Sequence, residues 1–171
     1  MIFLISGENS SGKSVFAEDL ITSVSASPVY VATMICSSKD NEKRILKHRA
    51  RREGMGFRDV EEPLDLRQVA VDRNDSVLLE DLSNLLANVI FREGGNGASV
   101  LDQINEMAER CSRLFIVTIS GLDSSKYDGE TAGYINELNR LNADLEELSE
   151  VHVEMSNGRP VYLKGRPEDV H

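Results

Sequence analysis

The sequence predicts an α/β fold: a three-layer sandwich with helices on both faces of a mostly parallel central sheet, followed by a C-terminal β-hairpin. Short apolar runs alternate along the chain with longer segments whose apolar residues recur at helical spacing, which is typical of a parallel sheet. Near the end, Asn157-Gly158 separates two short β-rich runs, and this dipeptide is a strong hairpin signal.

Each element follows from its own pattern of residues. The first strand is an apolar run that ends in glycine. The helix expected at 41–52 is strongly basic, and Gly54 and Gly56 end it. Loops at 93–98 and 121–129 are rich in breakers, and the residues from 165 onward are expected to fray. In chain order, strands are expected at 2–6, 29–32, 57–60, 76–79, 114–118, 151–155 and 161–163, and helices at 13–24, 41–52, 64–71, 82–91, 100–111 and 130–148.

Length and composition indicate one globular domain over residues 1–171, because 40% of the chain is hydrophobic and 28% is charged. The formal net charge of -10 disfavours broad attraction to nucleic acid or to anionic membranes. No apolar run is long enough to span a bilayer and no signal peptide is apparent, so we expect a cytoplasmic protein. Cys36 and Cys111 lie far apart, which indicates reduced, partly buried thiols instead of a disulfide or a zinc site.

Residues 7–14 read G-E-N-S-S-G-K-S and lie between the first strand and the first helix, which is the context of a P-loop. Gly7 and Gly12 let the backbone curl so that its N–H groups point at phosphate oxygens. Lys13 is expected to reach the β and γ phosphates, and the Ser14 hydroxyl to ligate Mg²⁺. Motif and context favour this P-loop over a chance glycine-serine turn, so the fold is expected to be of the P-loop nucleoside triphosphatase type. The residues expected to bind the nucleotide here are Gly7, Glu8, Asn9, Ser10, Ser11, Gly12, Lys13 and Ser14.

Acidic residues near the bound phosphates could either ligate Mg²⁺ or repel the phosphates, depending on their position. In a P-loop site, an acid at the end of a neighbouring strand holds Mg²⁺, and Glu80 and Asp81 follow the strand at 76–79. Position favours Glu80 as a ligand, whereas Asp81 suits a ligand role and the N-cap of the next helix equally well. Glu8 would repel bound phosphate unless its carboxylate is directed outward.

His48 lies in the basic segment 43–52 of an otherwise acidic chain, and two interpretations stay open. The segment is either a solvated helical face with an incidental histidine, or a positive field that suits a nucleoside triphosphate. In the second interpretation, neutral His48 attacks an α-phosphate while Arg52, one turn on, neutralises the developing charge. His152 and His171 lie in no comparable pattern.

Several motifs together resemble one family, the bifunctional adenosylcobinamide kinase and adenosylcobinamide-phosphate guanylyltransferase of cobalamin biosynthesis. The resemblance covers nearly the whole chain. Its most specific part is R-I-x-x-H-x-x-x-R after a Y-V-A-T strand, because a P-loop is shared by many families. The matching residues are MIFLISGENSSGKS with Ala17-Glu18, VYVAT at 29–33, Arg44 to Arg52, Phe57, Glu61-Glu62-Pro63, LLED at 78–81, Asn84, NVIF at 88–91, IVT at 116–118 and Asn142.

The resemblance implies a kinase that phosphorylates the aminopropanol hydroxyl of adenosylcobinamide, and a guanylyl transfer from GTP through a GMP-histidine intermediate. His48 falls on the position of that histidine, Arg52 on the arginine that follows it, and Glu80 on the acid after the third strand. Lys13 and Ser14 would serve the phosphates and Mg²⁺. The resemblance further implies GTP or ATP and a corrinoid as substrates, and a homotrimer with nucleotide near the subunit boundaries.

Three stretches depart from the family pattern. Glu8, Asn9 and Ser10 replace glycine, alanine and arginine, residues 119–122 read I-S-G-L where the family has N-E-V-G, and Asn139 replaces a glycine. These departures concern substrate recognition and the kinase step more than the nucleotide site or His48. The alternatives are therefore a divergent paralogue with one activity or another small-molecule acceptor, a P-loop kinase unrelated to cobinamide, and a non-catalytic nucleotide-binding protein.

Overall fold

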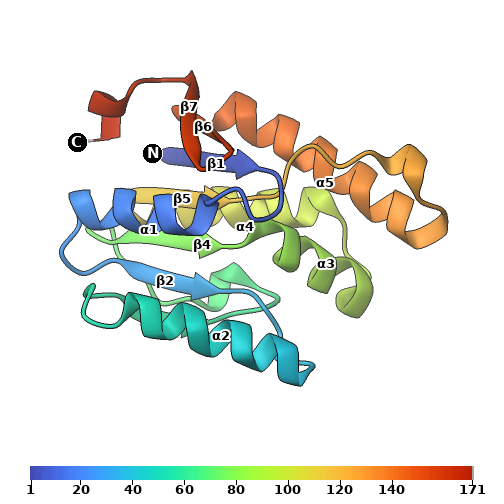
Figure 1. The fold of residues 1–171 in the computed structure, drawn as a ribbon, viewed down its shortest axis with the longest axis horizontal. Coiled ribbons are helices and arrows are strands. Elements are labelled where there is room, and N and C mark those ends of the chain that lie inside the picture. The colour runs from blue at the N-terminus through green and yellow to red at the C-terminus, as the bar shows by residue number, and fades with distance from the viewer. Residues whose placement is uncertain (171) are drawn as a thin grey trace.

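The computed structural model describes residues 1–170 and contains a seven-stranded sheet in the order β3-β2-β4-β5-β1-β6-β7 (Figure 1). All neighbouring strands are parallel except β6 and β7, which run antiparallel. This topology confirms the predicted α/β fold with its C-terminal hairpin. The strands are β1 Ile2–Gly7, β2 Val29–Ala32, β3 Arg58–Glu61, β4 Ser76–Glu80, β5 Arg113–Val117, β6 Val151–Ser156 and β7 Arg159–Lys164.

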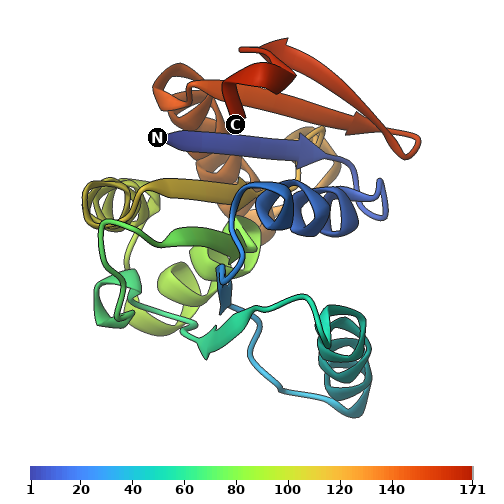
Figure 2. The same ribbon diagram turned by 90° about the vertical axis from the view of Figure 1, so that its left-hand side faces the viewer.

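Helices cover both faces of the sheet (Figures 1 and 2). On one face, Ala17 and Ile21 of α1 belong to the same apolar cluster as Phe3 and Ile5 of β1. On the other face, the apolar residues of α3, α4 and α5 form a second cluster with Leu4 of β1. The helices are α1 Lys13–Val24, α2 Lys39–Arg52, α3 Leu82–Glu93, α4 Gly97–Arg110 and α5 Gly129–Leu148, with 3-10 turns at Leu66–Gln68, Ser124–Lys126 and Pro167–Val170.

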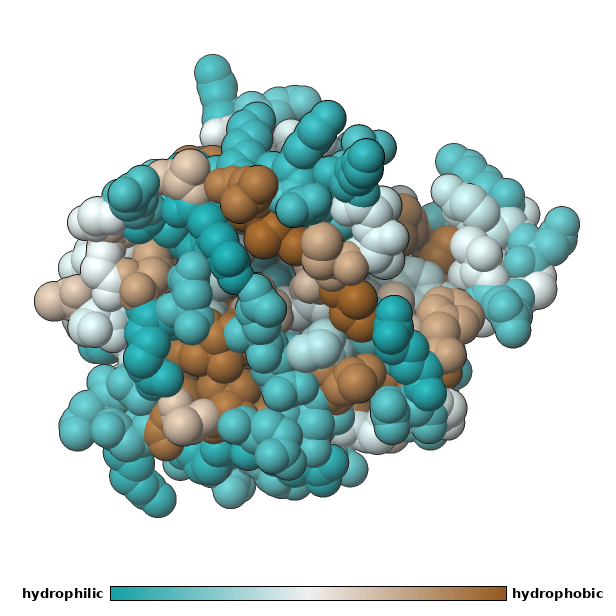
Figure 3. Space-filling model, turned by 90° about the horizontal axis from the view of Figure 1, so that it is seen from below, coloured by the Kyte–Doolittle hydropathy of each residue, from teal (hydrophilic) through white to brown (hydrophobic). Residues whose placement is uncertain are grey.

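The helix α2 lies apart from both layers, near the end of the sheet formed by β2 and β3 (Figures 1 and 2). Ser38 caps its N-terminus by accepting a hydrogen bond from the Asn41 backbone N–H at 3.2 Å. Acidic residues in the first turn and arginines in the last turn complement the helix dipole. Only Arg52 of this helix is buried. From below, the molecule shows a mostly hydrophilic surface with apolar side chains in separate patches (Figure 3).

Two elements differ most from those predicted, each because a polar side chain bonds to the nearby backbone. The expected helix at 64–71 is only the 3-10 turn Leu66–Gln68. The helix α4 begins at Gly97, inside the expected loop, because Asn96 and Ser99 form a capping box. The predicted hairpin turn is confirmed: Asn157 and Gly158 have φ angles of 50° and 74°, as a tight two-residue connection requires.

The C-terminal segment and one of the two cysteines differ from what the sequence predicts. The 3-10 turn Pro167–Val170 lies within the segment expected to fray, and His171 lies outside the described residues. Cys111 is a buried free thiol, whereas Cys36 is exposed and not partly buried as expected. Within residues 1–170, no helix combines the length and the apolar character needed to cross a membrane.

The parallel strands bring their carboxyl ends to one edge of the sheet. There β2 ends beside β4, with Ala32 opposite Glu80, and β1 runs into residues 8–12 beside β5. Ligands of open α/β sheets bind outside this edge. The fold thus places the P-loop and the acids that follow β4 in one region.

Candidate active site

The P-loop connects β1 to α1, and it needs glycine at position 7 for close packing and at position 12 for a positive φ angle. A Cβ on Gly7 would lie 2.7 Å from the Met155 carbonyl oxygen and 2.7 Å from Ser11 Oγ, and Gly12 has a φ angle of 91°. The hairpin between β6 and β7 lies against this loop, because a Cβ on Gly12 would be 3.7 Å from the Cα of Gly158. Only glycine therefore fits at position 7, and the hairpin supports the outer side of the loop.

The Lys13 side chain folds back over the loop. Its Nζ donates a hydrogen bond to the Glu8 carbonyl oxygen at 2.6 Å and lies 3.5 Å from Ser11 Oγ. Burial lowers the pKa of Lys13, while the carboxylates of Asp81 and Glu80 act in the opposite direction. The ammonium group is thus held beside the loop's backbone, where a P-loop lysine contacts phosphate.

Ser14 and Glu80 are joined directly across the site. The Ser14 hydroxyl donates a hydrogen bond to Glu80 Oε1, while the buried Oε2 has no hydrogen-bond partner among the described residues. Burial, with the neighbouring Asp81 carboxylate, raises the pKa of Glu80 to about 8. A hydroxyl and a carboxylate with an unpartnered oxygen are hard oxygen ligands, so this pair fits Mg²⁺.

The structure shows Asp81 as the N-cap of α3. Its Oδ1 accepts hydrogen bonds from the Asn84 backbone N–H and from Ser83 Oγ, both at 2.8 Å. The hydroxyl of Thr33, at the end of β2, bonds to the Asp81 backbone N–H and carbonyl oxygen at 2.9 and 2.8 Å. Burial raises the pKa of Asp81. The cap engages one oxygen of this carboxylate, and Oδ2 is left for other ligands.

Ion pairs attach the C-terminal half of α2 to the body of the protein. Arg51 forms two hydrogen bonds of 2.7 Å with the buried carboxylate of Glu18 in α1. Arg49 pairs with Glu61 at the end of β3. Since both acids belong to other elements, these contacts set the position of α2 and of His48 on it.

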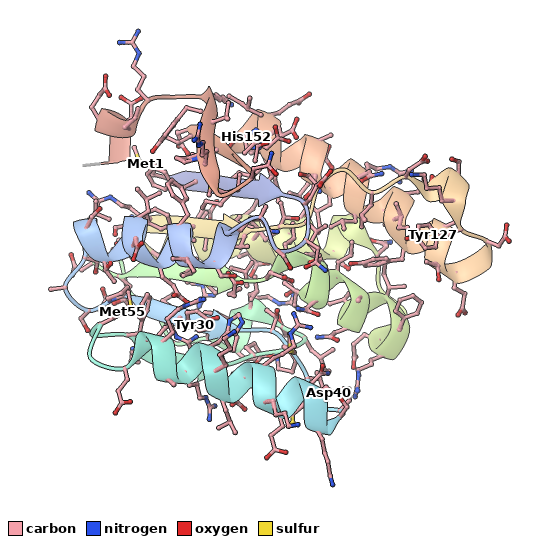
Figure 4. The ribbon with its side chains drawn as sticks, in the orientation of Figure 1. Met1, Tyr30, Asp40, Met55, Tyr127 and His152 are labelled. Atoms are coloured by element: carbon pink, nitrogen blue, oxygen red, sulfur yellow. The ribbon has the colours of Figure 1, made fainter. Side chains whose placement is uncertain are left out.

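Arg52 is more buried than the other residues of α2. It pairs with Asp59 of β3 at 2.9 Å, and its guanidinium lies 3.4 Å from the centre of the Tyr30 ring. Tyr30 lies between β2 and α2 in Figure 4. The Nε and Nη1 atoms of Arg52 are buried without a hydrogen-bond partner among the described residues. Arg52 therefore anchors the helix and still has donors available.

His48 is half-buried on α2. Burial lowers its pKa, and the cations Arg51, Arg52, Arg44 and Lys47 lower that pKa further. The imidazole is consequently neutral at neutral pH, as a nitrogen nucleophile must be. This environment differs from that of an incidental histidine on a solvated helical face.

One cavity of about 670 Å³ joins the P-loop to α2. His48 and Arg52 line it from one side, and the P-loop residues from Asn9 to Ser14 with Glu80 and Asp81 line it from the other. Gly7 and Glu8 are the two predicted nucleotide-binding residues that do not line it. Its volume is in the range of ordinary small-molecule sites.

Sequence patterns missed several residues of this cavity. Tyr30 and Asp59 belong to short strands, and a strand-end rule applied to β3 could have found only Glu61. Tyr134 comes from α5, and its hydroxyl donates to the Ser83 carbonyl oxygen at 2.9 Å. No local pattern marks Tyr134, because its place depends on how α5 packs against α3.

His152 lies away from this cavity. Its Nε2 is 2.8 Å from Ser6 Oγ, and both side chains are buried. Figure 4 shows His152 at the hairpin, on the opposite side of the molecule from α2. This pair is part of the packing of β1 on β6.

Comparison with known proteins agrees with this geometry. The protein family described as cobinamide kinase / cobinamide phosphate guanyltransferase matches residues 3–163. The bifunctional adenosylcobalamin biosynthesis protein CobP of Pseudomonas aeruginosa is 28% identical over 172 aligned positions, which cover 96% of this chain and 98% of that protein.

Solved structures show the same fold at low sequence identity. One comes from work on a prototypical ATPase from the type III secretion system of pathogenic bacteria. It aligns with a TM-score of 0.55 and 10% identity. The alignment covers 91% of this chain, which spans about half, 51%, of the ATPase chain. Another is that of Project ID PH0250 from Pyrococcus horikoshii OT3, with a TM-score of 0.53 and 12% identity over 99% of this chain and 88% of that one. On the match over residues 3–163, the chain belongs to the cobinamide kinase / cobinamide phosphate guanyltransferase family and is a transferase of phosphorus-containing groups.

Proposed function

We propose that this chain phosphorylates the aminopropanol hydroxyl of adenosylcobinamide and then transfers GMP from GTP to adenosylcobinamide phosphate through a GMP-His48 intermediate. The family and the CobP relative support the two general activities. The observation that carries the proposal is the single cavity lined by both His48 and the P-loop. One bound triphosphate can present its γ-phosphate to one reaction and its α-phosphate to the other.

In the guanylyl transfer, the neutral imidazole of His48 attacks the α-phosphorus of GTP. A nitrogen–phosphorus bond forms, the bond between that phosphorus and the bridging oxygen breaks, and pyrophosphate leaves. Arg44 and Lys47 line the same cavity and offset the charge that develops on the phosphate oxygens. The phosphate of the corrinoid then attacks the same phosphorus and releases His48.

In the kinase step, the P-loop backbone and Lys13 hold the β and γ phosphates of ATP or GTP. Ser14 and Glu80 would hold Mg²⁺, with the Oδ2 atom of Asp81 as a further candidate ligand. When bound, Mg²⁺ supplies positive charge that neutralises phosphate oxygens.

Incubation with α-labelled GTP and Mg²⁺ tests the intermediate. Wild-type protein should acquire an acid-labile, base-stable label, and His48→Ala should acquire none. Lys13→Ala, in which the phosphate cradle is damaged, should label slowly while retaining His48. Equal labelling of wild type and His48→Ala contradicts the proposal, as does the absence of label on wild type.

The departures at Glu8 and at 119–122 favour a second candidate, in which the chain keeps only one of the two reactions or uses another small-molecule acceptor. Separate assays with cobinamide and with cobinamide phosphate distinguish the candidates. The proposal also includes a cytoplasmic location and a homotrimer; light scattering on the purified protein tests the trimer.

A further inference from the structure

The three departures from the family pattern meet at one corner of the molecule. Glu8 Cγ and Oε1 lie 3.7 and 3.8 Å from the position that a Cβ on Gly121 would occupy. The Ser120 backbone N–H donates to the Gly7 carbonyl oxygen at 3.1 Å, and Asn139 Nδ2 donates to the Leu122 carbonyl oxygen at 3.1 Å. The P-loop, the loop after β5 and the helix α5 thus contact one another where each is unusual.

From this arrangement we propose that Glu8 is the catalytic base of the phosphoryl-transfer step, accepting the proton of the acceptor hydroxyl at this corner. The inference rests on the proposed function for the kinase step alone and is independent of His48. The predicted difficulty with Glu8, repulsion of bound phosphate, is resolved because its exposed carboxylate is directed toward Gly121.

The corner is held rigidly by α5. Asn142 Nδ2 donates to the Ile119 carbonyl oxygen at 2.9 Å, while its Oδ1 accepts a 2.7 Å hydrogen bond from the buried Thr118 hydroxyl. Gly121 has a φ angle of 80° and no side chain, which leaves room for the Glu8 carboxylate. A base on a fixed loop is better positioned for proton transfer than one on a mobile segment.

The position of Glu8 relative to the phosphates follows from Lys13. The Glu8 carbonyl oxygen accepts the 2.6 Å hydrogen bond of the Lys13 ammonium, the group expected to contact the β and γ phosphates. The next residue, Asn9, lines the cavity, as does Ile119 across the corner. Glu8 therefore stands at the exposed rim, beside the part of the P-loop where the β and γ phosphates are expected.

Glu8 lies beside the cavity, and each of the four carboxylates that line the cavity has at least one oxygen engaged. Asp59 pairs with an arginine, Glu61 likewise, Glu80 accepts from Ser14, and Asp81 caps α3. Among residues 1–170, no hydrogen bond or ion pair involves the Glu8 side chain. Glu8 differs from those four because it is exposed and both of its carboxylate oxygens are free to accept a proton.

In the proposed step, the acceptor oxygen forms a bond to the γ-phosphorus and the bond from that phosphorus to the β–γ bridging oxygen breaks. The nucleoside diphosphate leaves, and the hydroxyl proton passes to Glu8 and from there to water. A rim position suits an alcohol attached to a bulky group, because the bulk can remain outside the cavity.

Glu8→Gln tests this role with Glu93→Gln as the matched control, since Glu93 is exposed at the end of α3 and far from the P-loop in the chain. Glu8→Gln should lower the turnover of cobinamide phosphorylation by about 100-fold or more, with a much smaller change in nucleotide KM. Labelling of His48 by α-labelled GTP should remain, which shows that the nucleotide site is intact. Glu93→Gln should behave as wild type.

A second variant tests the place of the carboxylate. Ser120→Glu, added to Glu8→Gln, should restore a substantial part of the kinase turnover because it returns an acid to the same corner. Kinase turnover of Glu8→Gln within tenfold of wild type overturns the proposal, and so does a wild-type chain that labels His48 but phosphorylates no alcohol. Kinase turnover that depends on Glu8 in a chain without His48 labelling contradicts only the guanylyl transfer.

Discussion

At the scale of single residues, two glycines after α2 share a backbone conformation and differ in their surroundings. Gly54 and Gly56 have φ angles of 81° and 84°. A Cβ on Gly56 would lie 2.6 Å from the Ala26 carbonyl oxygen, whereas a Cβ on Gly54 would have no neighbour within 4 Å among the described residues. An alanine at position 54 would therefore cause backbone strain alone, whereas an alanine at position 56 would add steric overlap.

Alanine at either position should destabilise the protein by about 1–2 kcal/mol, because an L residue is strained at positive φ. Gly56→Ala should cost about 1–3 kcal/mol more, because it also forces the chain away from Ala26. Urea unfolding of the two variants measures the difference. Equal free energies of unfolding would show that the approach to Ala26 relaxes without cost.

The second residue-scale prediction concerns the titration of His48. Because burial and four neighbouring cations lower its pKa, the imidazole stays neutral below the ordinary pKa of about 6.5. The rate of labelling at GTP concentrations well below KM reports the free protein, so it should fall with a midpoint below pH 6.5 as His48 becomes protonated.

Arg44→Gln removes one of those cations, so the pKa of His48 should rise and the acid limb of the labelling profile should move to higher pH. Arg73→Gln, an exposed residue outside the cavity lining, is the charge-matched control. Initial labelling rates from pH 5 to 8 provide the measurement. An identical acid limb in both variants argues against His48 as the titrating group.

At the scale of elements, α2 is attached mainly by charged side chains, and these differ in burial. The Glu18 side chain is 2% exposed in its pair with Arg51, whereas the pair of Arg49 and Glu61 is 48% and 68% exposed. A buried carboxylate needs its partner far more than an exposed one does.

Arg51→Met should destabilise the protein by about 3 kcal/mol, because it leaves Glu18 buried with only Arg52 at 3.9 Å. Arg49→Met, the same change on the same helix, should cost at most about 1 kcal/mol. Chemical denaturation compares the two. A double variant with Glu18→Leu should recover much of the loss, since no buried charge remains unpaired.

At the scale of the whole molecule, nucleotide binding should be visible as stabilisation. A ligand at 100 times its dissociation constant adds about 2.7 kcal/mol to the folded state. For a chain of this size that corresponds to a rise in Tm of roughly 5–11 °C. Thermal unfolding with GTP or ATP and Mg²⁺ measures the shift.

Lys13→Ala should lose most of this rise in Tm, because the ammonium group expected to contact the phosphates is gone. Lys126→Ala, an exposed residue in the loop before α5, should keep it. A full rise in Tm for Lys13→Ala would place the nucleotide outside the P-loop.

Much of the fold was predictable because its signals are local. The buried strands β1, β4 and β5 are continuous apolar runs, and α1 and α5 carry apolar residues at helical spacing. Predictions failed where short polar contacts decide the structure: Asn96 and Ser99 start α4 within an expected loop, and residues 64–71 form a single 3-10 turn. Such contacts depend on side-chain geometry more than on hydrophobic period.

The sequence by itself determined the P-loop and the type of fold, because a phosphate cradle is made of consecutive residues between one strand and one helix. Only the tertiary structure decided what shares the site with that loop. Arg51 meets Glu18 across 33 positions, and this distant pair sets where α2 holds His48. Glu8 likewise faces Gly121 because β1 and β5 are neighbours in the sheet. Strand order and helix docking arise from long-range packing, which no local pattern of residues specifies.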